Sequence, residues 1–175
     1  EDELSRAGAV LARPLLVPYD ALGREVGADA GVEVGYGVIT YESIYLGVID
    51  RVADGVSRAL LFSSAGVRTP AIIDRINLDV ELVGRGGVNF EIQLPQNLVI
   101  EEGDRIITRG SQPRIIAVVE RVDVHPSDSF QVVLAQYPLN ISHVRWVEIS
   151  SEAQTPSIPD SFFEPRVAEP TETDL

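Results

Sequence analysis

The segment Leu78–Leu94, with the sequence LDVELVGRGGVNFEIQL, decides the fold class because its apolar residues fall on every second position on either side of a glycine-rich stretch. Side chains of a β-strand point alternately to its two faces, so this spacing predicts two strands that each bury one face and expose the other. Between them lies Gly84-Arg85-Gly86-Gly87, whose glycines adopt turn conformations that other residues avoid. The segment is therefore predicted to form a β-hairpin.

The same β signal extends from Leu15 to Ile149. This span is rich in Val and Ile, glycines recur along it, and no long stretch shows the 3.6-residue period of a helix. Further strands are predicted at Tyr36–Thr40, Ile44–Val52, Arg58–Phe62, Val67–Ile73, Arg105–Thr108, Arg114–Val124, Phe130–Tyr137 and Arg145–Ile149. About ten short strands in one flat sheet would leave exposed edges, which promote aggregation. We therefore expect an all-β fold with two small six-stranded-type β-barrels.

The first barrel and the second are expected to lie within residues 13–149. The division between them is placed near residues 70–75, and the C-terminal strands are candidates to complete the first barrel. Residues 1–12 are predicted to form a short N-terminal helical remnant, which ends where Arg13-Pro14 and Val17-Pro18 force extended backbone.

The C-terminal residues 150–175 differ in composition from the barrel region. They are rich in Pro, Ser, Thr and acidic residues without any periodicity, which predicts a disordered acidic tail. Phe162-Phe163 is unusual in such a tail. We interpret this pair either as a local attachment to the barrel surface or as a short motif that docks on a partner.

Composition excludes several classes of function. The 175 residues carry 14 Lys plus Arg against 27 Asp plus Glu, a formal net charge of −13, and every basic residue is arginine. This charge is opposite to that of nucleic-acid-binding surfaces and disfavours binding to anionic lipid surfaces.

The chain has no cysteine, which excludes thiol catalysis, iron–sulfur clusters and zinc fingers. It has no apolar stretch of transmembrane length, and because it contains no methionine, not even at its first position, we expect a processed or excised part of a longer protein.

The search for a catalytic or metal site is short, because the sequence has only two histidines, His125 and His143. The stretch His125-Pro126-Ser127-Asp128 contains the residue types of a hydrolytic triad. Neighbours in a turn cannot align hydroxyl, imidazole and carboxylate, so a hairpin turn is predicted instead. Glu101-Glu102-Gly103-Asp104 is interpreted as a turn with solvated charges. We therefore expect no catalytic residue, no cofactor and no metal ion.

Five segments, in a fixed order, carry a resemblance to a known family. Val26–Thr40 resembles a G-x-x-x-G-V-x-x-G-x-x-V stretch that opens the family's first barrel, and Tyr45–Val52 resembles its L-V-G-x-V-x-x-V strand. Ser57–Phe62 is similar to S-x-V-x-L-I, Ile100–Gly110 to I-K-x-G-D-x-V-V-T-S-G, and Val118–Ala135 to the closing strands. The family is that of the rod shape-determining protein MreC. One departure is Arg109, which stands where the family usually has Ser.

This resemblance implies a non-enzymatic scaffold of the bacterial cell-elongation machinery, which organises peptidoglycan synthesis. It implies that residues 1–12 are the end of a coiled coil and that the barrels are periplasmic, anchored to the inner membrane by an upstream transmembrane helix. The implied partners are a second copy of the chain, as a homodimer or higher assembly, and the elongation transpeptidase, a class B penicillin-binding protein. MreD and MreB would be contacted through the part upstream of this chain.

Two other functions stay open at this stage. A soluble β-barrel binding module of an envelope adaptor would share the glycine-punctuated barrels but would lack an upstream anchor. A double-barrel serine hydrolase is compatible with the barrel shape, since a fold does not determine a function, but the placement of the histidines disfavours it.

A scaffold without catalysis acts through its surface, where a few aromatic or arginine anchors carry most of the binding energy. Tyr41 and Tyr45 cluster around a predicted turn at Thr40–Ser43, and Tyr45 shares one face of its strand with Ile49. In one interpretation Tyr41, Tyr45 and Ile49 contact a second copy or the transpeptidase. In the other, Tyr45 and Ile49 pack between the two barrels.

Overall fold

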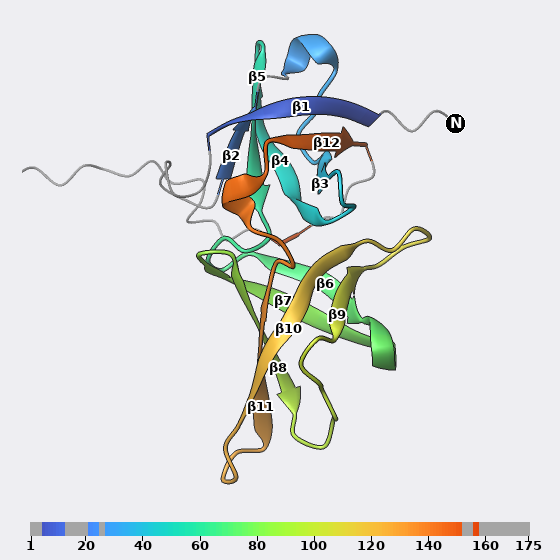
Figure 1. Ribbon diagram of the computed structural model, residues 1–175, viewed down its shortest axis with the longest axis vertical. Coiled ribbons are helices and arrows are strands. Elements are labelled where there is room, and N and C mark those ends of the chain that lie inside the picture. Colours follow the sequence, from blue (N-terminus) through green and yellow to red (C-terminus); the bar gives the residue numbers. More distant parts are fainter. Residues whose placement is uncertain (1–4, 13–20, 25–26, 152–155, 158–175) are drawn as a thin grey trace, which may run out of the picture.

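The computed structural model describes residues 5–12, 21–24, 27–151 and 156–157, which form an all-β structure (Figure 1). The strands are β1 (Ser5–Ala12), β2 (Ala21–Arg24), β3 (Gly37–Thr40), β4 (Tyr45–Ala53), β5 (Val56–Leu61), β6 (Arg68–Ile73), β7 (Leu78–Gly86), β8 (Asn89–Pro95), β9 (Arg105–Thr108), β10 (Ile115–Val124), β11 (Phe130–Gln136) and β12 (Trp146–Ser150). Within these described residues, helical backbone is limited to three short 3-10 segments, η2 (Ala28–Ala30), η3 (Asp74–Ile76) and η4 (Ile141–His143). The all-β prediction is confirmed.

The strands close into two barrels that lie one above the other in Figure 1. Barrel 1 has the strand order β1-β12-β3-β4-β5-β2, and barrel 2 has the order β10-β11-β8-β7-β6-β9. Neighbouring strands pair in the antiparallel sense throughout both barrels. Closure removes the long free edges that a flat sheet would expose.

The chain crosses from barrel 1 to barrel 2 between β5 and β6 and returns between β11 and β12. The first crossing turns at Ser64–Gly66, where Val67 N donates to Ser64 O at 3.0 Å and Gly66 has a φ of 84°. Barrel 2 therefore begins at β6, a few residues before the division expected near residues 70–75. The physical reason for this boundary is the turn at Gly66, because glycine readily adopts a positive φ and such a φ ends the extended backbone of the strand.

The predicted N-terminal helix is wrong for the residues that the structure describes. Ser5–Ala12 form strand β1, which pairs with β12 through contacts such as Ala7↔Glu148 and with β2 through Val10↔Arg24. Gly8 disfavours a helix in this segment. In addition, β12 provides a strand with which β1 can form backbone hydrogen bonds, and β12 lies far away in the sequence, so local propensity is a weak guide here. The rest of the proposed coiled-coil end, residues 1–4, lies outside the described residues, as do residues 152–155 and 158–175 of the predicted disordered tail, including Phe162-Phe163. Of the described part of that tail, Ser150 ends β12 and Ser157 pairs with Arg68.

The hairpin predicted at Leu78–Leu94 is confirmed as β7 and β8. In β8 the apolar side chains of Phe90, Ile92 and Leu94 are buried, while Glu91 and Gln93 alternate with them on the more exposed face. This arrangement directs one face of the hairpin into the core of barrel 2, as the period-2 pattern predicts.

The junction between the barrels is built on Tyr137, which follows β11 at the start of the return to barrel 1. Its hydroxyl donates to Leu46 O in β4 and accepts from Ser63 N at 3.3 Å in the first crossing. Its ring meets Phe90 of barrel 2 edge-on, with ring centroids 4.9 Å apart. One buried side chain thus links β4, the crossing and barrel 2.

Gly84 allows the first crossing to approach barrel 2 closely. Its N–H donates to Val67 O at 2.8 Å, and its carbonyl accepts from Gly66 N at 2.9 Å. A Cβ at this position would lie 2.2 Å from Ser64 O and 2.5 Å from Phe62 O, which is impossible without moving the backbone. Glycine is therefore required here by the close contact of the two chain segments rather than by its φ angle.

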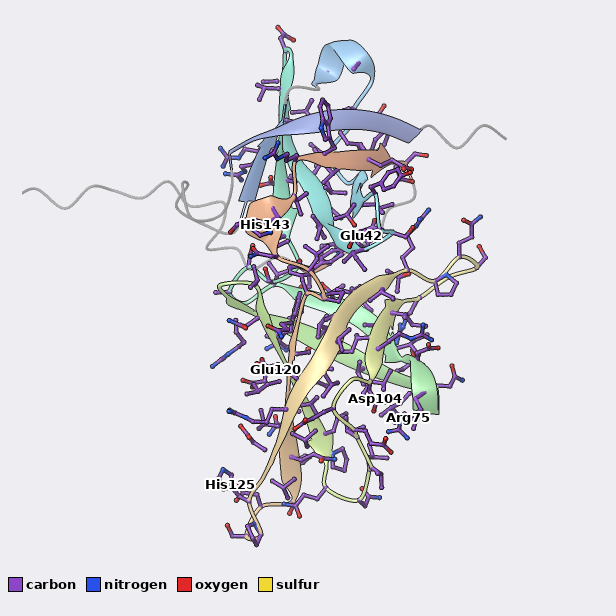
Figure 2. All side chains as sticks on the ribbon, viewed as in Figure 1. Glu42, Arg75, Asp104, Glu120, His125 and His143 are labelled. Atoms are coloured by element: carbon purple, nitrogen blue, oxygen red, sulfur yellow. The ribbon has the colours of Figure 1, made fainter. Side chains whose placement is uncertain are left out.

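A buried carboxylate, Asp104, fixes the loop before β9. Arg75 in η3 donates to both of its oxygens, from Nε at 2.6 Å and from Nη2 at 2.8 Å, and Glu101 N donates to it at 2.9 Å (Figure 2). The turn predicted at Glu101–Asp104 is present, but Asp104 is not solvated, because the loop folds it against η3. The hydrogen bond from Arg75 holds the pKa of Asp104 below its ordinary value, against the opposing effect of burial, with the Glu101 N–H adding to the decrease.

We predict that Tyr137→Phe lowers the free energy of unfolding by about 1–3 kcal/mol, because the ring contact remains while Ser63 N–H loses its buried acceptor. Chemical denaturation monitored by circular dichroism measures this change. Tyr41→Phe, which removes a hydroxyl from an exposed ring, is the matched control and should leave the midpoint unchanged. Equal midpoints for wild type and Tyr137→Phe would show that the hydroxyl does not stabilise the junction.

We predict that Asp104→Asn lowers the unfolding free energy at neutral pH by about 1–3 kcal/mol, because a charge-assisted contact is lost while the amide still accepts from Glu101. A carboxylate with a lowered pKa in the folded state stabilises the fold fully above its unfolded pKa, near 3.9, and progressively less as the pH falls through the folded pKa. The difference between wild type and variant should therefore shrink below about pH 4. Glu102→Gln, at an exposed position of the same turn, is the control. A difference that stays constant from pH 7 to pH 3 would contradict the assignment.

Candidate protein-interaction surface

Two of the three residues proposed as interaction anchors are buried. Tyr45 is 2% exposed and stacks on Phe62 with ring centroids 5.2 Å apart, and Ile49 is 0% exposed. The reason is that β4 buries its residues from Tyr45 to Ile49 on both faces, one of them toward the junction, before it reaches solvent at Arg51. Neither side chain can contact a partner in this structure, so the structure removes both from the candidate surface.

Tyr41 is the anchor that remains on the surface, and a second aromatic lies beside it. Tyr41 is 96% exposed at the turn between β3 and β4, and Trp146 is 63% exposed at the start of β12. Val147 pairs with Thr40 at the end of the β3–β12 ladder, and Trp146 and Tyr41 are the residues next to this pair. Both exposed residues line the same depression, so they belong to one surface.

A shallow depression of about 510 Å³ adjoins these rings. Its lining residues are Thr40, Tyr41, Glu42, Pro138, Leu139, Asn140, His143, Val144, Arg145 and Trp146. We call these residues together the aromatic patch. Its lining combines aromatic and aliphatic side chains with one carboxylate, from Glu42, and one guanidinium, from Arg145. This is the composition of a protein-binding surface rather than of a small-molecule site.

The connection from β11 to β12 forms one wall of the aromatic patch and also borders a second, larger depression. This junction groove, of about 640 Å³, is lined by Gly87, Val88, Val118, Val119, Glu120, Gln136, Tyr137, Pro138, Leu139, Asn140, Ile141 and Ser142. Pro138, Leu139 and Asn140 line both hollows. The two depressions therefore flank one connection, and the surface they form spans both barrels.

Val88 in the junction groove has a φ of 69°, a conformation that β-branched residues rarely adopt. The turn that holds it is closed by Asn89 Nδ2, which donates to Gly87 O at 2.9 Å. Sequence reasoning placed Val88 on the hairpin strand and missed both the groove and Trp146. The groove has no local sequence signal, because its lining residues are far apart in the sequence. Trp146 has none either, because it joins Tyr41 at one surface only when the chain returns to barrel 1.

The histidines lie apart from each other and from any catalytic arrangement (Figure 2). His125 is at the tip of the β10–β11 hairpin, in a turn closed by Asp128 N, which donates to His125 O at 3.0 Å. His143 ends η4 and lines the aromatic patch on barrel 1. Among the described residues, no three His, Cys, Asp or Glu side chains are grouped closely enough to hold a metal ion. In the same part of the chain, no helix has the length and hydropathy needed to cross a bilayer.

A family model for the barrel core of the rod shape-determining protein MreC matches residues 23–151. The chain belongs to the MreC family. A cell shape-determining protein MreC from Caulobacter vibrioides (strain NA1000 / CB15N) is 32% identical over 137 residues, which cover 74% of this chain and 38% of that protein. The chain therefore spans less than half the length of this MreC relative.

Solved structures of MreC share the fold. The crystal structure of MreC from Pseudomonas aeruginosa aligns with a TM-score of 0.75 at 22% identity, covering 83% of this chain and 98% of that one. A chain from the complex between the penicillin-binding protein PBP2 and MreC from Helicobacter pylori aligns with a TM-score of 0.58 at 9% identity, covering 86% and 100%. At these identities, the likeness shows only that this chain shares the double-barrel fold of MreC.

We predict different effects of alanine at the two neighbouring tyrosines. Tyr45→Ala removes a buried ring stacked on Phe62 and should lower the unfolding free energy by about 3–5 kcal/mol. Tyr41→Ala removes an exposed ring and should change it by less than about 0.5 kcal/mol. Urea denaturation of the two variants checks this. A stability loss at Tyr41 as large as that at Tyr45 would mean that Tyr41 is part of the core.

Proposed function

We propose that this chain is the extracytoplasmic part of a non-enzymatic scaffold that binds an elongation transpeptidase through the aromatic patch. The observation that carries the proposal is the pair of exposed aromatics, Tyr41 and Trp146, which line one depression together with charged residues of both signs. Tyrosine and tryptophan are among the residues most enriched in binding hot spots, and a soluble monomer rarely exposes them together without a function.

A penicillin-binding protein is the partner favoured by the comparisons. PBP2 of Helicobacter pylori forms a complex with the MreC protein of that organism, and this chain has the MreC barrel core. A class B enzyme of this kind synthesises peptidoglycan cross-links, so a scaffold that holds it would organise peptidoglycan synthesis during cell elongation. The aromatic patch is lined by residues 40–42 of barrel 1 and by residues 138–146, which lie between the two barrels in the sequence, so recognition there would depend on the folded return to barrel 1.

Self-association of the chain, as a homodimer or a higher assembly, is part of the same proposal. One solved structure of MreC with this fold is described as the major periplasmic domain of that protein. We propose that this chain is likewise extracytoplasmic and that an upstream transmembrane helix anchors it to the membrane. Contacts with MreD and MreB would be made by that upstream part. Membership of the family favours this scaffold over a soluble envelope adaptor.

The absence of catalysis is also a proposal, which rests on the geometry of the described residues. Ser127 Oγ lies 3.3 Å from Asp128 in the exposed turn that follows His125, so the hydroxyl meets the carboxylate rather than the imidazole of its own turn. A serine nucleophile needs an imidazole as its base, held in place by a third group. We assign no catalytic residue, cofactor or metal ion to the chain.

We predict that Tyr41→Ala combined with Trp146→Ala weakens binding to the transpeptidase ectodomain by about 2 kcal/mol or more, because both rings lose their contact area. Sedimentation velocity and isothermal titration of the purified ectodomains measure this loss, and sedimentation of the scaffold alone reports self-association. The double variant should keep the wild-type unfolding midpoint.

Phe130→Ala is the matched control, because Phe130 is an aromatic exposed to 52% on β11 in barrel 2, outside the aromatic patch. It should bind like wild type. Unchanged binding and unchanged self-association in the double variant would exclude the aromatic patch as the interaction surface. Equal losses in the double variant and in Phe130→Ala would show that exposed aromatics act nonspecifically.

A further inference from the structure

The chain crosses between the barrels once more after β12. Ser157 pairs with Arg68, the first residue of β6, as an isolated antiparallel bridge. Arg68 N donates to Ser157 O at 3.0 Å, and Ser157 N donates to Arg68 O at 2.8 Å. Both bonds involve only backbone atoms. The segment that leaves barrel 1 at Ser150 is therefore attached to a strand of barrel 2.

This attachment uses a gap in the hydrogen-bonding of barrel 2. On one side β6 pairs with β7 along its whole length, from Arg68↔Val83 onward. On the other side β9 reaches only as far as Ala71↔Thr108, so the first residues of β6 extend beyond it. Arg68 would otherwise present an unpaired N–H and C=O at this edge, and such edges accept extended segments.

The sequence confines the attachment to this single pair. Continued in the same antiparallel register, the next hydrogen-bonded pairs would join positions 155 and 70 on one side and positions 159 and 66 on the other. Position 70 is Pro70 and position 159 is Pro159, and proline has no N–H to donate. Gly66 N–H is already donated to Gly84 O at 2.9 Å. Beside Arg68, the β6 edge therefore has no free N–H at position 66 or at position 70 with which to extend the ladder.

We propose that the exposed edge of β6 at Arg68 is a strand-addition site for an extended segment, and that its occupant is the C-terminal segment of this same chain around Ser157. The segment acts as a releasable strap between the barrels. A ladder of one pair opens far more easily than the closed barrels on either side of it, because local opening free energy follows the number of cooperating contacts. Opening frees the N–H and C=O of Arg68 at the β6 edge.

The strap is independent of the proposed transpeptidase contact. Arg68 and Ser157 belong to neither the aromatic patch nor the junction groove. The two proposals can therefore fail separately. Unchanged transpeptidase binding in the double variant at Tyr41 and Trp146 would exclude the aromatic patch and leave the strap intact. Absence of the strap would leave binding at the aromatic patch intact.

The test compares Ser157→Pro with Ser157→Ala in the full chain, with amide hydrogen exchange at Arg68 as the readout. Proline removes the N–H that donates to Arg68 O, and alanine keeps the backbone bonds and removes only the hydroxyl. We expect the Arg68 amide to exchange at least about tenfold faster in Ser157→Pro and at the wild-type rate in Ser157→Ala. The amide of Ile92, inside the β7–β8 hairpin, should be equally protected in all three proteins.

A second arm asks whether the vacated edge accepts the segment in trans. A synthetic peptide with the sequence of residues 152–163 is added to the Ser157→Pro chain and should restore protection at Arg68, while the same peptide carrying Pro at position 157 should not. Wild-type chain, whose edge is occupied, should not respond to either peptide. Identical Arg68 exchange in wild type, Ser157→Pro and Ser157→Ala would overturn the proposal, and so would failure of the peptide to protect Arg68 in the Ser157→Pro chain.

Discussion

Barrel 1 depends on a strand that comes from the far end of the folded chain. β12 lies between β1 and β3, and a single residue, Glu148, is paired with Ala7 on one side and with Ile39 on the other. Without β12, barrel 1 would be an open sheet with two unpaired edges. All six strands of barrel 2 lie between β5 and β12 in the sequence, so barrel 1 cannot close until the chain has passed through barrel 2 and returned. The two barrels are thus one folding unit with many long-range contacts.

This return constrains the junction. Tyr137 holds the returning connection against the outgoing crossing, and Gly84 of β7 holds that crossing against barrel 2. The returning connection then passes over the outside of both barrels to reach β12. Its residues 138–140 line both depressions, and its end delivers Trp146 next to Tyr41. The candidate surface is therefore a consequence of the topology that closes barrel 1.

The separation of paired strands along the sequence explains how much of the fold could be predicted from the sequence. The β7–β8 hairpin follows from its own residues, because the paired strands are adjacent and their alternation is local. Strand β1 was predicted as helix, because its partner β12 is nearly the whole chain away. Alternation left two interpretations of Tyr45 open, and the burial of β4 on both faces favours the one in which Tyr45 packs inside the protein. In the candidate site, Tyr41 was found because a tight turn exposes it locally. Trp146 was missed because only the register Val147↔Thr40 directs it outward.

Charge bears on which partner the aromatic patch can accept. The arginines of barrel 2 are largely engaged by acids of the same barrel, through the pairs Arg68–Glu81, Arg75–Asp104, Arg85–Glu91, Arg105–Asp74, Arg109–Asp79 and Arg121–Asp123. These local pairs leave the excess of acidic residues, −13 over the chain, to determine the long-range field. Two copies of the chain repel each other through that field, whereas a partner with a basic surface is attracted by it. At the patch itself, Glu42 and Arg145 balance each other, so the aromatic contact carries no local penalty of this kind. The field therefore favours a different protein over a second copy as the occupant of the patch, and any self-association must overcome a repulsion that a contact with a basic partner does not share.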